Sequence, residues 1–176
     1  TKIYGIMPYI APEVLIKKQY SFSSDIYSLG MIMWELTSGL RPFCNLAYTH
    51  LMFNICDKTL RPKITEDTPQ CWAILIQKCW HPNPSERPPI NEIYSEIISN
   101  YWNIDKIFIE AENKRKELLK SRKFIAKYMH PCSKTHSKLL NPTIDSMFSL
   151  FQNSRFFTSG STDSSQNISI LSLNLT

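Results

Sequence analysis

Glycine is scarce in this sequence, and its four glycines stand far apart along the chain. They are Gly5, Gly30, Gly39 and Gly160. A loop that cradles phosphate groups needs several glycines within a few residues, because its backbone must approach the phosphates closely. The sequence therefore offers no glycine-rich phosphate-binding loop.

Long apolar runs are absent as well. None approaches the roughly 20 residues that span a bilayer, and the first residues do not resemble a signal peptide, so we expect no membrane partner. The cysteines are odd in number and irregularly spaced: Cys44, Cys56, Cys71, Cys79 and Cys132. This pattern favours a reduced, intracellular and cytoplasmic setting over a disulfide framework. Because the first residue is Thr1 rather than methionine, we expect the chain to begin inside a longer one.

The longest apolar helix is expected over residues 23–39, S-S-D-I-Y-S-L-G-M-I-M-W-E-L-T-S-G. Ser23 or Ser24 can cap its first turn, Asp25 suits the positive end of the helix dipole, and Gly39 can end it in a left-handed conformation. Apolar residues between these ends occupy nearly every face. The pattern therefore predicts a central helix that is buried on all sides.

Four further helices are expected around it, over residues 11–16, 46–58, 69–80 and 90–102. Proline near the start of the first and third, and apolar residues at helical spacing in the others, support them. Residues 1–9 are expected to form a loop. The first segment that could form a strand, and only weakly, is residues 168–175. The fold class is therefore mainly α.

The character of the chain changes after residue 102. The formal net charge is +5, and nine lysines and arginines fall within residues 114–138. Glutamates interleave with many of them, which predicts a solvated helix over residues 103–128 rather than a nucleic-acid-binding surface. Residues 129–176 are expected to be a disordered, low-complexity tail that could bind a protein partner. Three of its residues, His130, Cys132 and His136, supply too few ligands at poor spacing for a metal site.

Three motifs in order resemble the C-terminal lobe of a eukaryotic protein kinase domain. They are Ala11-Pro12-Glu13, the Asp25-Ile26-Tyr27-Ser28-Leu29-Gly30 run, and Cys79-Trp80 followed by Arg87-Pro88. The last is similar to the tyrosine-kinase and tyrosine-kinase-like branch. The resemblance implies an incomplete kinase domain over residues 1–102. More narrowly, residues 4–10, 68–71 and 137–142 look like the expanded kinase families of arbuscular mycorrhizal fungi.

The resemblance implies two structural roles. Glu13 and Arg87 match a buried ion pair of the family, for which a guanidinium suits a carboxylate because it can donate two hydrogen bonds at fixed geometry. The alternative is two surface residues that never meet. Asp25 matches an aspartate that anchors the backbone of the catalytic loop. Alternatively, it is a helix-start aspartate that needs no partner.

A third set of residues matches the loop that docks the substrate. This docking loop consists of Gly5, Ile6, Met7, Pro8 and Tyr9. Serine/threonine kinases usually carry a hydroxyl residue where this chain has Ile6, so the departure leaves hydroxyl specificity open and raises the chance of weak or absent activity. Thr1 and Tyr4 lie in the region that matches the family's activation segment and are candidate phosphorylation sites. The alternative, that each is an ordinary loop residue, is the commoner case.

The family's catalytic motifs are missing from the sequence. No H-R-D, no D-F-G and no glycine-rich loop occurs, so no catalytic residue is expected in this chain. We therefore expect the C-terminal part of a kinase that transfers the ATP terminal phosphoryl group to protein Ser/Thr or Tyr hydroxyls. ATP and Mg²⁺ would bind to upstream residues of the full-length parent, and the 176-residue chain alone would be inactive. The alternative is a non-catalytic pseudokinase or a truncated interaction protein.

Overall fold

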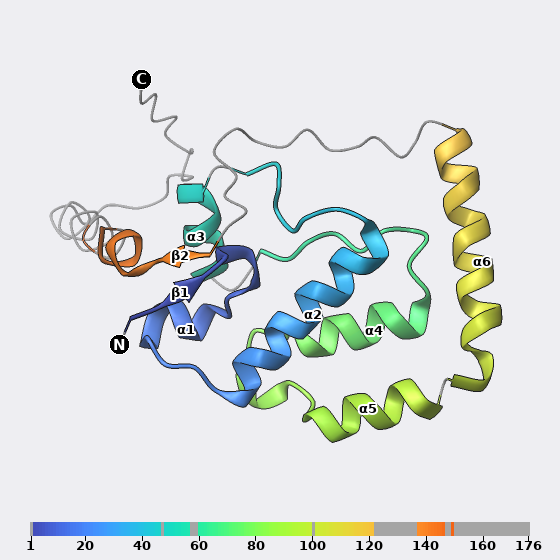
Figure 1. The fold of residues 1–176 in the computed structure, drawn as a ribbon, viewed down its shortest axis with the longest axis horizontal. Helices are drawn as coiled ribbons and strands as arrows, with labels where there is room; N and C mark the ends of the chain where they lie inside the picture. The colour runs from blue at the N-terminus through green and yellow to red at the C-terminus, as the bar shows by residue number, and fades with distance from the viewer. Residues whose placement is uncertain are drawn as a thin grey trace, which may run out of the picture. The chain divides into compact units, whose positions relative to one another are not determined.

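The computed structural model describes residues 2–46, 48–56, 60–99, 101–121, 137–146 and 149. The chain divides into two compact units, residues 1–141 and 142–176, and the elements named here belong to the first. Its helices are α1 (Pro12–Lys17), α2 (Phe22–Ser38), α3 (Tyr48–Cys56), α4 (Gln70–Cys79), α5 (Ile90–Ser99) and α6 (Tyr101–Lys120). Two short 3₁₀ helices, η1 (Met7–Tyr9) and η2 (Pro84–Glu86), and two strands, β1 (Tyr4–Gly5) and β2 (Lys138–Leu139), complete it (Figure 1). The expected mainly helical fold is confirmed.

Helix α2 is the central element, and it contacts η1, α4 and η2. Its N-cap is Ser21 rather than the predicted Ser23 or Ser24. The Ser21 side chain accepts a hydrogen bond from the Ser24 amide, and the Ser24 hydroxyl in turn accepts one from the Ser21 amide. This reciprocal capping box extends the helix one residue towards the N-terminus. Gly39 ends it with φ 67°, as predicted.

The crossing of α2 and α4 depends on Gly30. A Cβ atom at this position would lie 2.8 Å from Cys79 Cβ and 3.3 Å from the Trp80 amide nitrogen. Neither neighbour is the end of a flexible side chain, so neither can swing away. The absence of a side chain at Gly30 therefore sets how closely the two helices approach.

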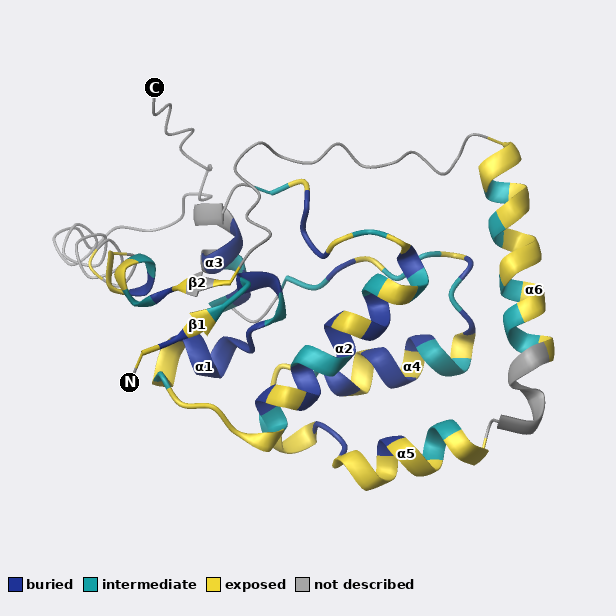
Figure 2. Ribbon diagram, in the orientation of Figure 1, coloured by how far each residue is buried: buried dark blue, intermediate teal, exposed yellow. Residues whose placement is uncertain are grey.

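One face of α2 is exposed, contrary to the prediction of burial on all sides. Phe22 is 92% exposed, Leu36 72% and Ile32 46% (Figure 2). The prediction failed because apolar residues on every face of a helix do not show whether another element of the chain packs against each face. The buried side of α2 includes Tyr27 and Met31, both at 0% exposure.

The pairing of β1 with β2 was not predicted. Tyr4 pairs with Leu139 and Gly5 with Lys138 in an antiparallel, two-stranded sheet. The segment expected to be a loop thus contains a short strand, and the tail expected to be disordered contributes the strand Lys138–Leu139. The weak strand candidate at residues 168–175 lies outside the described residues.

Helix α6 contacts α5 and is joined to the segment before α4. Arg115 Nε donates a 2.6 Å hydrogen bond to Asp67 Oδ2, and the Asp67 side chain is 1% exposed. Burial raises the pKa of Asp67, but hydrogen bonds from Thr65 and Arg115 outweigh it and hold the pKa below its usual range. Most of the described surface of α6 is exposed or half-buried, as the charge pattern predicted (Figure 2). No helix among the described residues is long and apolar enough to cross a membrane.

Candidate functional site

The docking loop is built around η1 and held in shape by its own backbone. The Tyr9 amide donates to the Ile6 carbonyl and the Ile10 amide to the Met7 carbonyl, both at 3.0 Å. Met7 and Pro8 are buried, whereas Ile6 is half-buried. Gly5 and Tyr9 are half-buried as well, and Ile6 places an apolar side chain at its partly accessible position.

Gly5 allows the chain to enter this loop. Its φ is +154°, which side-chain-bearing residues rarely adopt, and a Cβ atom here would lie 2.6 Å from Ile10 Cδ1. The backbone conformation therefore favours glycine here, whereas the contact is with the end of the Ile10 side chain, which can move.

Two hydrogen bonds fix the docking loop to α2. The Ser28 hydroxyl donates to the Tyr9 carbonyl at 2.7 Å, and the Tyr9 hydroxyl donates to a Glu35 carboxylate oxygen. Burial and the Glu35 carboxylate both raise the pKa of Tyr9, so its hydroxyl remains a proton donor at physiological pH. The position of the loop is therefore set by the central helix.

Glu13 and Arg87 form a buried ion pair. Arg87 Nη1 and Nη2 donate to the two carboxylate oxygens of Glu13 at 2.6 and 2.9 Å, and the Arg87 side chain is 0% exposed. Arg87 also donates from Nη1 to the Ser23 carbonyl at 2.8 Å and from Nε to the His81 carbonyl at 2.9 Å. The structure thus brings together the two residues that the sequence analysis paired, in the two-bond geometry argued for a guanidinium.

Sequence reasoning missed the tyrosine and the second arginine beside this pair. The guanidinium carbons of Arg61 and Arg87 each lie 5.2 Å from the ring centroid of Tyr27. Burial raises the pKa of the Tyr27 hydroxyl. Arg61 also donates from Nε to the Trp80 carbonyl at 2.9 Å. Arg-Pro dipeptides occur at residues 41–42, 61–62 and 87–88, so this repeat alone does not single out Arg61 and Arg87.

The remaining site predictions fall at the surface or outside the described residues. Asp25 lies in the first turn of α2 and is exposed. Tyr4 is 55% exposed, and its carbonyl accepts a 2.8 Å hydrogen bond from the Tyr20 hydroxyl. Thr1 lies outside the described residues. The structure does not join Asp25 or Tyr4 to the ion pair through any hydrogen bond between described residues.

The described residues contain no cluster of three or more histidines, cysteines, aspartates or glutamates that could hold a metal ion. The three tail residues weighed as metal ligands lie outside this part of the chain. The four cysteines within it, Cys44, Cys56, Cys71 and Cys79, carry free thiols.

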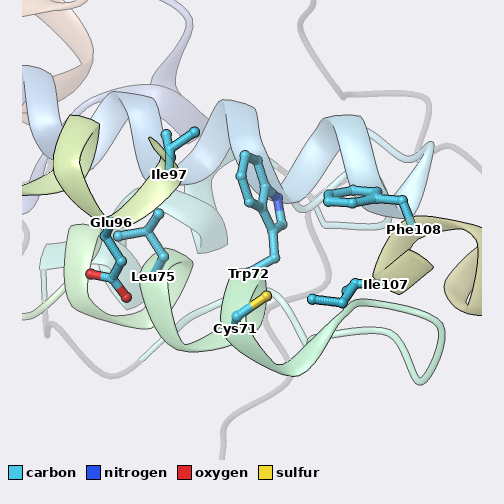
Figure 3. Close-up of a pocket in the computed structure, with 7 residues that line it drawn as sticks. All are labelled: Cys71, Trp72, Leu75, Glu96, Ile97, Ile107 and Phe108. Atoms are coloured by element: carbon cyan, nitrogen blue, oxygen red, sulfur yellow. The ribbon is translucent and has the colours of Figure 1, made fainter. Parts of the chain in front are cut away.

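An apolar pocket lies where α4, α5 and α6 come together. It is lined by Cys71, Trp72, Leu75, Glu96, Ile97, Ile107 and Phe108 (Figure 3). The rings of Trp72 and Phe108 meet edge to face, with centroids 5.8 Å apart and planes inclined by 77°. Glu96 is the one acidic residue in this lining, and Lys78 Nζ lies 3.2 Å from its carboxylate. The side chains around this pocket therefore pack α6 against the bundle. They offer few polar groups that could bind a ligand or take part in a reaction.

Comparison with known proteins identifies the family. Residues 3–97 match the family model described as protein tyrosine and serine/threonine kinase. The chain is 30% identical to the serine/threonine/tyrosine-protein kinase HT1 of Arabidopsis thaliana over 128 residues, which are 73% of this chain and 32% of HT1. It is 38% identical to the dual specificity protein kinase shkA of Dictyostelium discoideum over 94 residues, which are 53% of this chain and 18% of shkA. The chain thus spans less than a third of either relative. It belongs to the protein tyrosine and serine/threonine kinase family.

Proposed function

We propose that this chain supplies the substrate-docking part of a protein kinase that transfers the terminal phosphoryl group of ATP to hydroxyl groups of protein substrates. The observation that carries the proposal is the docking loop, which Ser28 and Glu35 fix to α2. A loop that selects a substrate residue must hold its shape, since a misplacement of about 1 Å can cost a hundredfold in rate. These contacts supply that rigidity.

ATP and Mg²⁺ would be bound by residues outside this chain, because its sequence contains no H-R-D, D-F-G or glycine-rich loop. Bound Mg²⁺ neutralises charge on the transferring phosphoryl group. We assign Asp25 the role of an anchor, whose exposed carboxylate is free to accept hydrogen bonds from a catalytic loop. The 176-residue chain alone should therefore neither bind ATP nor transfer phosphate.

We propose that both Ser/Thr and Tyr hydroxyls are acceptable substrates. HT1 is named a serine/threonine/tyrosine kinase and shkA a dual specificity kinase. Ile6 fits this assignment, because it places an apolar side chain at the position where serine/threonine kinases usually carry a hydroxyl residue. We also propose that the chain belongs to the tyrosine-kinase-like branch and to the expanded kinase families of arbuscular mycorrhizal fungi. Its proposed location is the cytoplasm. Thr1 and Tyr4 are proposed phosphorylation sites, of which Tyr4 is exposed.

A non-catalytic role is the second candidate. Ile6 cannot contact catalytic groups through a hydroxyl, and the exposed apolar side chains of Phe22 and Leu36 could bind a protein partner. In that case the domain would act as a pseudokinase or a truncated interaction protein.

The experiment that separates these candidates is a chimera in which residues 3–97 replace the matching segment of HT1. We expect the purified chimera to phosphorylate a general protein substrate and to lose at least tenfold in rate on Asp25→Asn, which removes the anchoring charge. A chimera that folds and binds ATP but transfers no phosphate would favour the non-catalytic role. The matched control is Glu92→Gln on α5, an exposed acidic residue in a helix first turn that should leave the rate unchanged.

A further inference from the structure

The two strands of the small sheet come from distant parts of the chain, yet they are closely joined. Beyond the paired residues of β1 and β2, the Leu140 amide donates to the Ile3 carbonyl at 2.7 Å. The Ile3 amide donates to the Asn141 side-chain oxygen, also at 2.7 Å. Residues 137–141 therefore bind residues 3–5 along one continuous backbone edge.

Side chains along this edge alternate between buried and exposed. Ile3 and Leu140 are both at 0% exposure, whereas their neighbours Tyr4 and Leu139 are 55% and 36% exposed. This is the period of two that a strand with one buried face requires. Leu140 is thus an apolar anchor for residues 137–141.

Asn141 and Pro142 define where the pairing stops. The Asn141 side chain, rather than a backbone carbonyl, accepts the hydrogen bond from the Ile3 amide. Pro142 has no N–H group and cannot extend the ladder. The pattern Leu-Leu-Asn-Pro therefore encodes both the anchor and the end of the bound segment.

The opposite backbone edge of β1 is also bound. Successive residues of an antiparallel strand direct their polar backbone groups to alternate sides. Ile3 points its carbonyl at Leu140, and the carbonyl of Tyr4 accepts instead from the Tyr20 hydroxyl. Residues 137–141 thus occupy the edge of β1 that Tyr20 leaves available.

This edge leads directly into the docking loop, because Gly5 is both the last residue of β1 and the first residue of that loop. We propose that residues 137–141 are an intramolecular peptide ligand of β1, and that the edge at residues 3–5 is a binding site for extended peptides of the Lys-Leu-Leu-Asn type. While the tail segment is bound, it excludes any other peptide from this edge. An effect of this pairing on substrate docking would follow only if the proposed function holds, and in that respect the inference rests on it.

The binding mode is the addition of a strand to a sheet edge, in which backbone hydrogen bonds supply affinity and alternate side chains supply specificity. The covalent connection favours the tail over a free peptide of the same sequence, since its binding is intramolecular. The site should therefore accept a free peptide only when the tail segment is weakened.

The test uses the full 176-residue chain and a fluorescein-labelled peptide with the sequence of residues 137–142, Ser-Lys-Leu-Leu-Asn-Pro. We expect the double variant Leu140→Ala/Asn141→Ala to bind this peptide at least tenfold more tightly than the unmodified chain, as measured by fluorescence anisotropy. The control variant Leu119→Ala, a leucine truncation at a 51% exposed position of α6 outside the bound segment, should bind it as weakly as the unmodified chain does. Equal binding by the double variant and the unmodified chain, or no binding by either, overturns the proposal.

A second measurement does not depend on how the double variant folds. Hydrogen exchange of the Ile3 amide should be slow in the unmodified chain and at least tenfold faster in Asn141→Ala, while amides of α2 keep their rates. Exchange of Ile3 at the unprotected rate in the unmodified chain would overturn the proposal by itself. The HT1 chimera contains only residues 3–97, so its activity tests the proposed function without the tail segment. Peptide binding, together with a chimera that folds and binds ATP but transfers no phosphate, would leave this site standing and contradict the proposed phosphoryl transfer.

Discussion

Arg87 links three parts of the molecule through one side chain. Its guanidinium donates to Glu13 in α1, to the Ser23 carbonyl at the start of α2, and to the His81 carbonyl after α4. A lysine in its place would offer a single nitrogen and could not reach all three in the same geometry. Arg87 therefore acts as a cross-link whose charge is compensated within the fold.

Removal of the Glu13 carboxylate should leave the Arg87 guanidinium buried without a charged partner. We expect Glu13→Ala to lower the free energy of unfolding by about 3–5 kcal/mol, because a buried charge loses its partner. Arg87→Lys should also destabilise, since it keeps the charge but loses the two-bond geometry. Urea denaturation of the full chain measures both changes.

The matched control is an ion pair of the same kind at the surface. Lys116 and Glu112 lie 3.9 Å apart on α6, with side chains 60% and 54% exposed. Lys116→Met should change the free energy of unfolding by no more than about 0.5 kcal/mol. A loss of that small size in Glu13→Ala would contradict the interpretation of Glu13 and Arg87 as a buried cross-link.

How far single residues could be predicted depends on whether their partners are visible in the sequence. The pairing of Glu13 with Arg87 followed from family motifs in the expected order. The position of Tyr27 between Arg61 and Arg87 did not, because stacking on an aromatic ring depends on how α2 packs against two extended segments. The Ser21 cap was missed since several serines precede the apolar run, and composition does not choose among them.

At the scale of elements, the crossing of α2 and α4 is the contact most sensitive to one atom. In an open helix, Gly→Ala stabilises by about 0.5–1 kcal/mol, because alanine loses less conformational entropy on folding. At Gly30 the added Cβ would lie 2.8 Å from Cys79 Cβ, so the helices must move apart. We expect Gly30→Ala to destabilise by about 1–3 kcal/mol, as overpacking usually does, and urea denaturation to show it.

The control for this prediction is Leu36→Ala, at a 72% exposed position of the same helix. It changes side-chain volume at a largely exposed position and should shift the free energy of unfolding by less than about 0.5 kcal/mol. If Gly30→Ala stabilised the chain, as in an open helix, the close approach of α2 and α4 would be refuted.

The helices up to α5 could be placed from sequence within a few residues, but the strands could not. Helix α6 ends at Lys120, whereas the predicted helix ran to residue 128, and residues 122–128 lie outside the described residues. Proline, serine and glycine at the ends, and apolar spacing between them, are local signals that act within each helix. A two-residue strand has no periodicity to detect, and β1 finds its partner about 130 residues away. The exposed face of α2 escaped prediction for a related reason, since burial depends on which neighbours are present.

At the scale of the whole first unit, α2 connects nearly all the features of the site. It binds the docking loop through Ser28 and Glu35, offers the Ser23 carbonyl to Arg87, and holds the segment before α4 through Trp34 Nε1, which donates to the Lys63 carbonyl at 3.0 Å. Because so many contacts share one helix, these parts should unfold together. A change in conditions that acts on buried groups in several of these elements should therefore lower the free energy of unfolding of the whole unit in one transition.

Alkaline pH is such a change. Burial raises the pKa of the Cys79 thiol on α4 from 9.0 to about 12, and that of Cys56 on α3 to about 11. The folded chain therefore holds protons that the unfolded chain releases near pH 9, so stability is fully present below pH 9 and falls as the pH rises towards 12. We expect urea denaturation to give a constant free energy of unfolding up to about pH 8 and a steady decline above pH 9, with up to about 1.4 kcal/mol per pH unit from Cys79.

Two variants separate thiol ionisation from a general weakening of the core. Cys79→Ala keeps the Cβ that faces Gly30 but removes the thiol, so its decline above pH 9 should be shallower than that of the unmodified chain. Leu75→Ala, at a buried position of the same helix, should lower stability by the same amount at every pH, because it removes no titratable group. Burial of Tyr9 and Tyr27 raises their pKa values too, so some decline should persist in both variants at the highest pH. An unchanged slope in Cys79→Ala would mean that this thiol reaches solvent in the folded chain, and the close crossing of α2 and α4 would then be the part of the structure to revise.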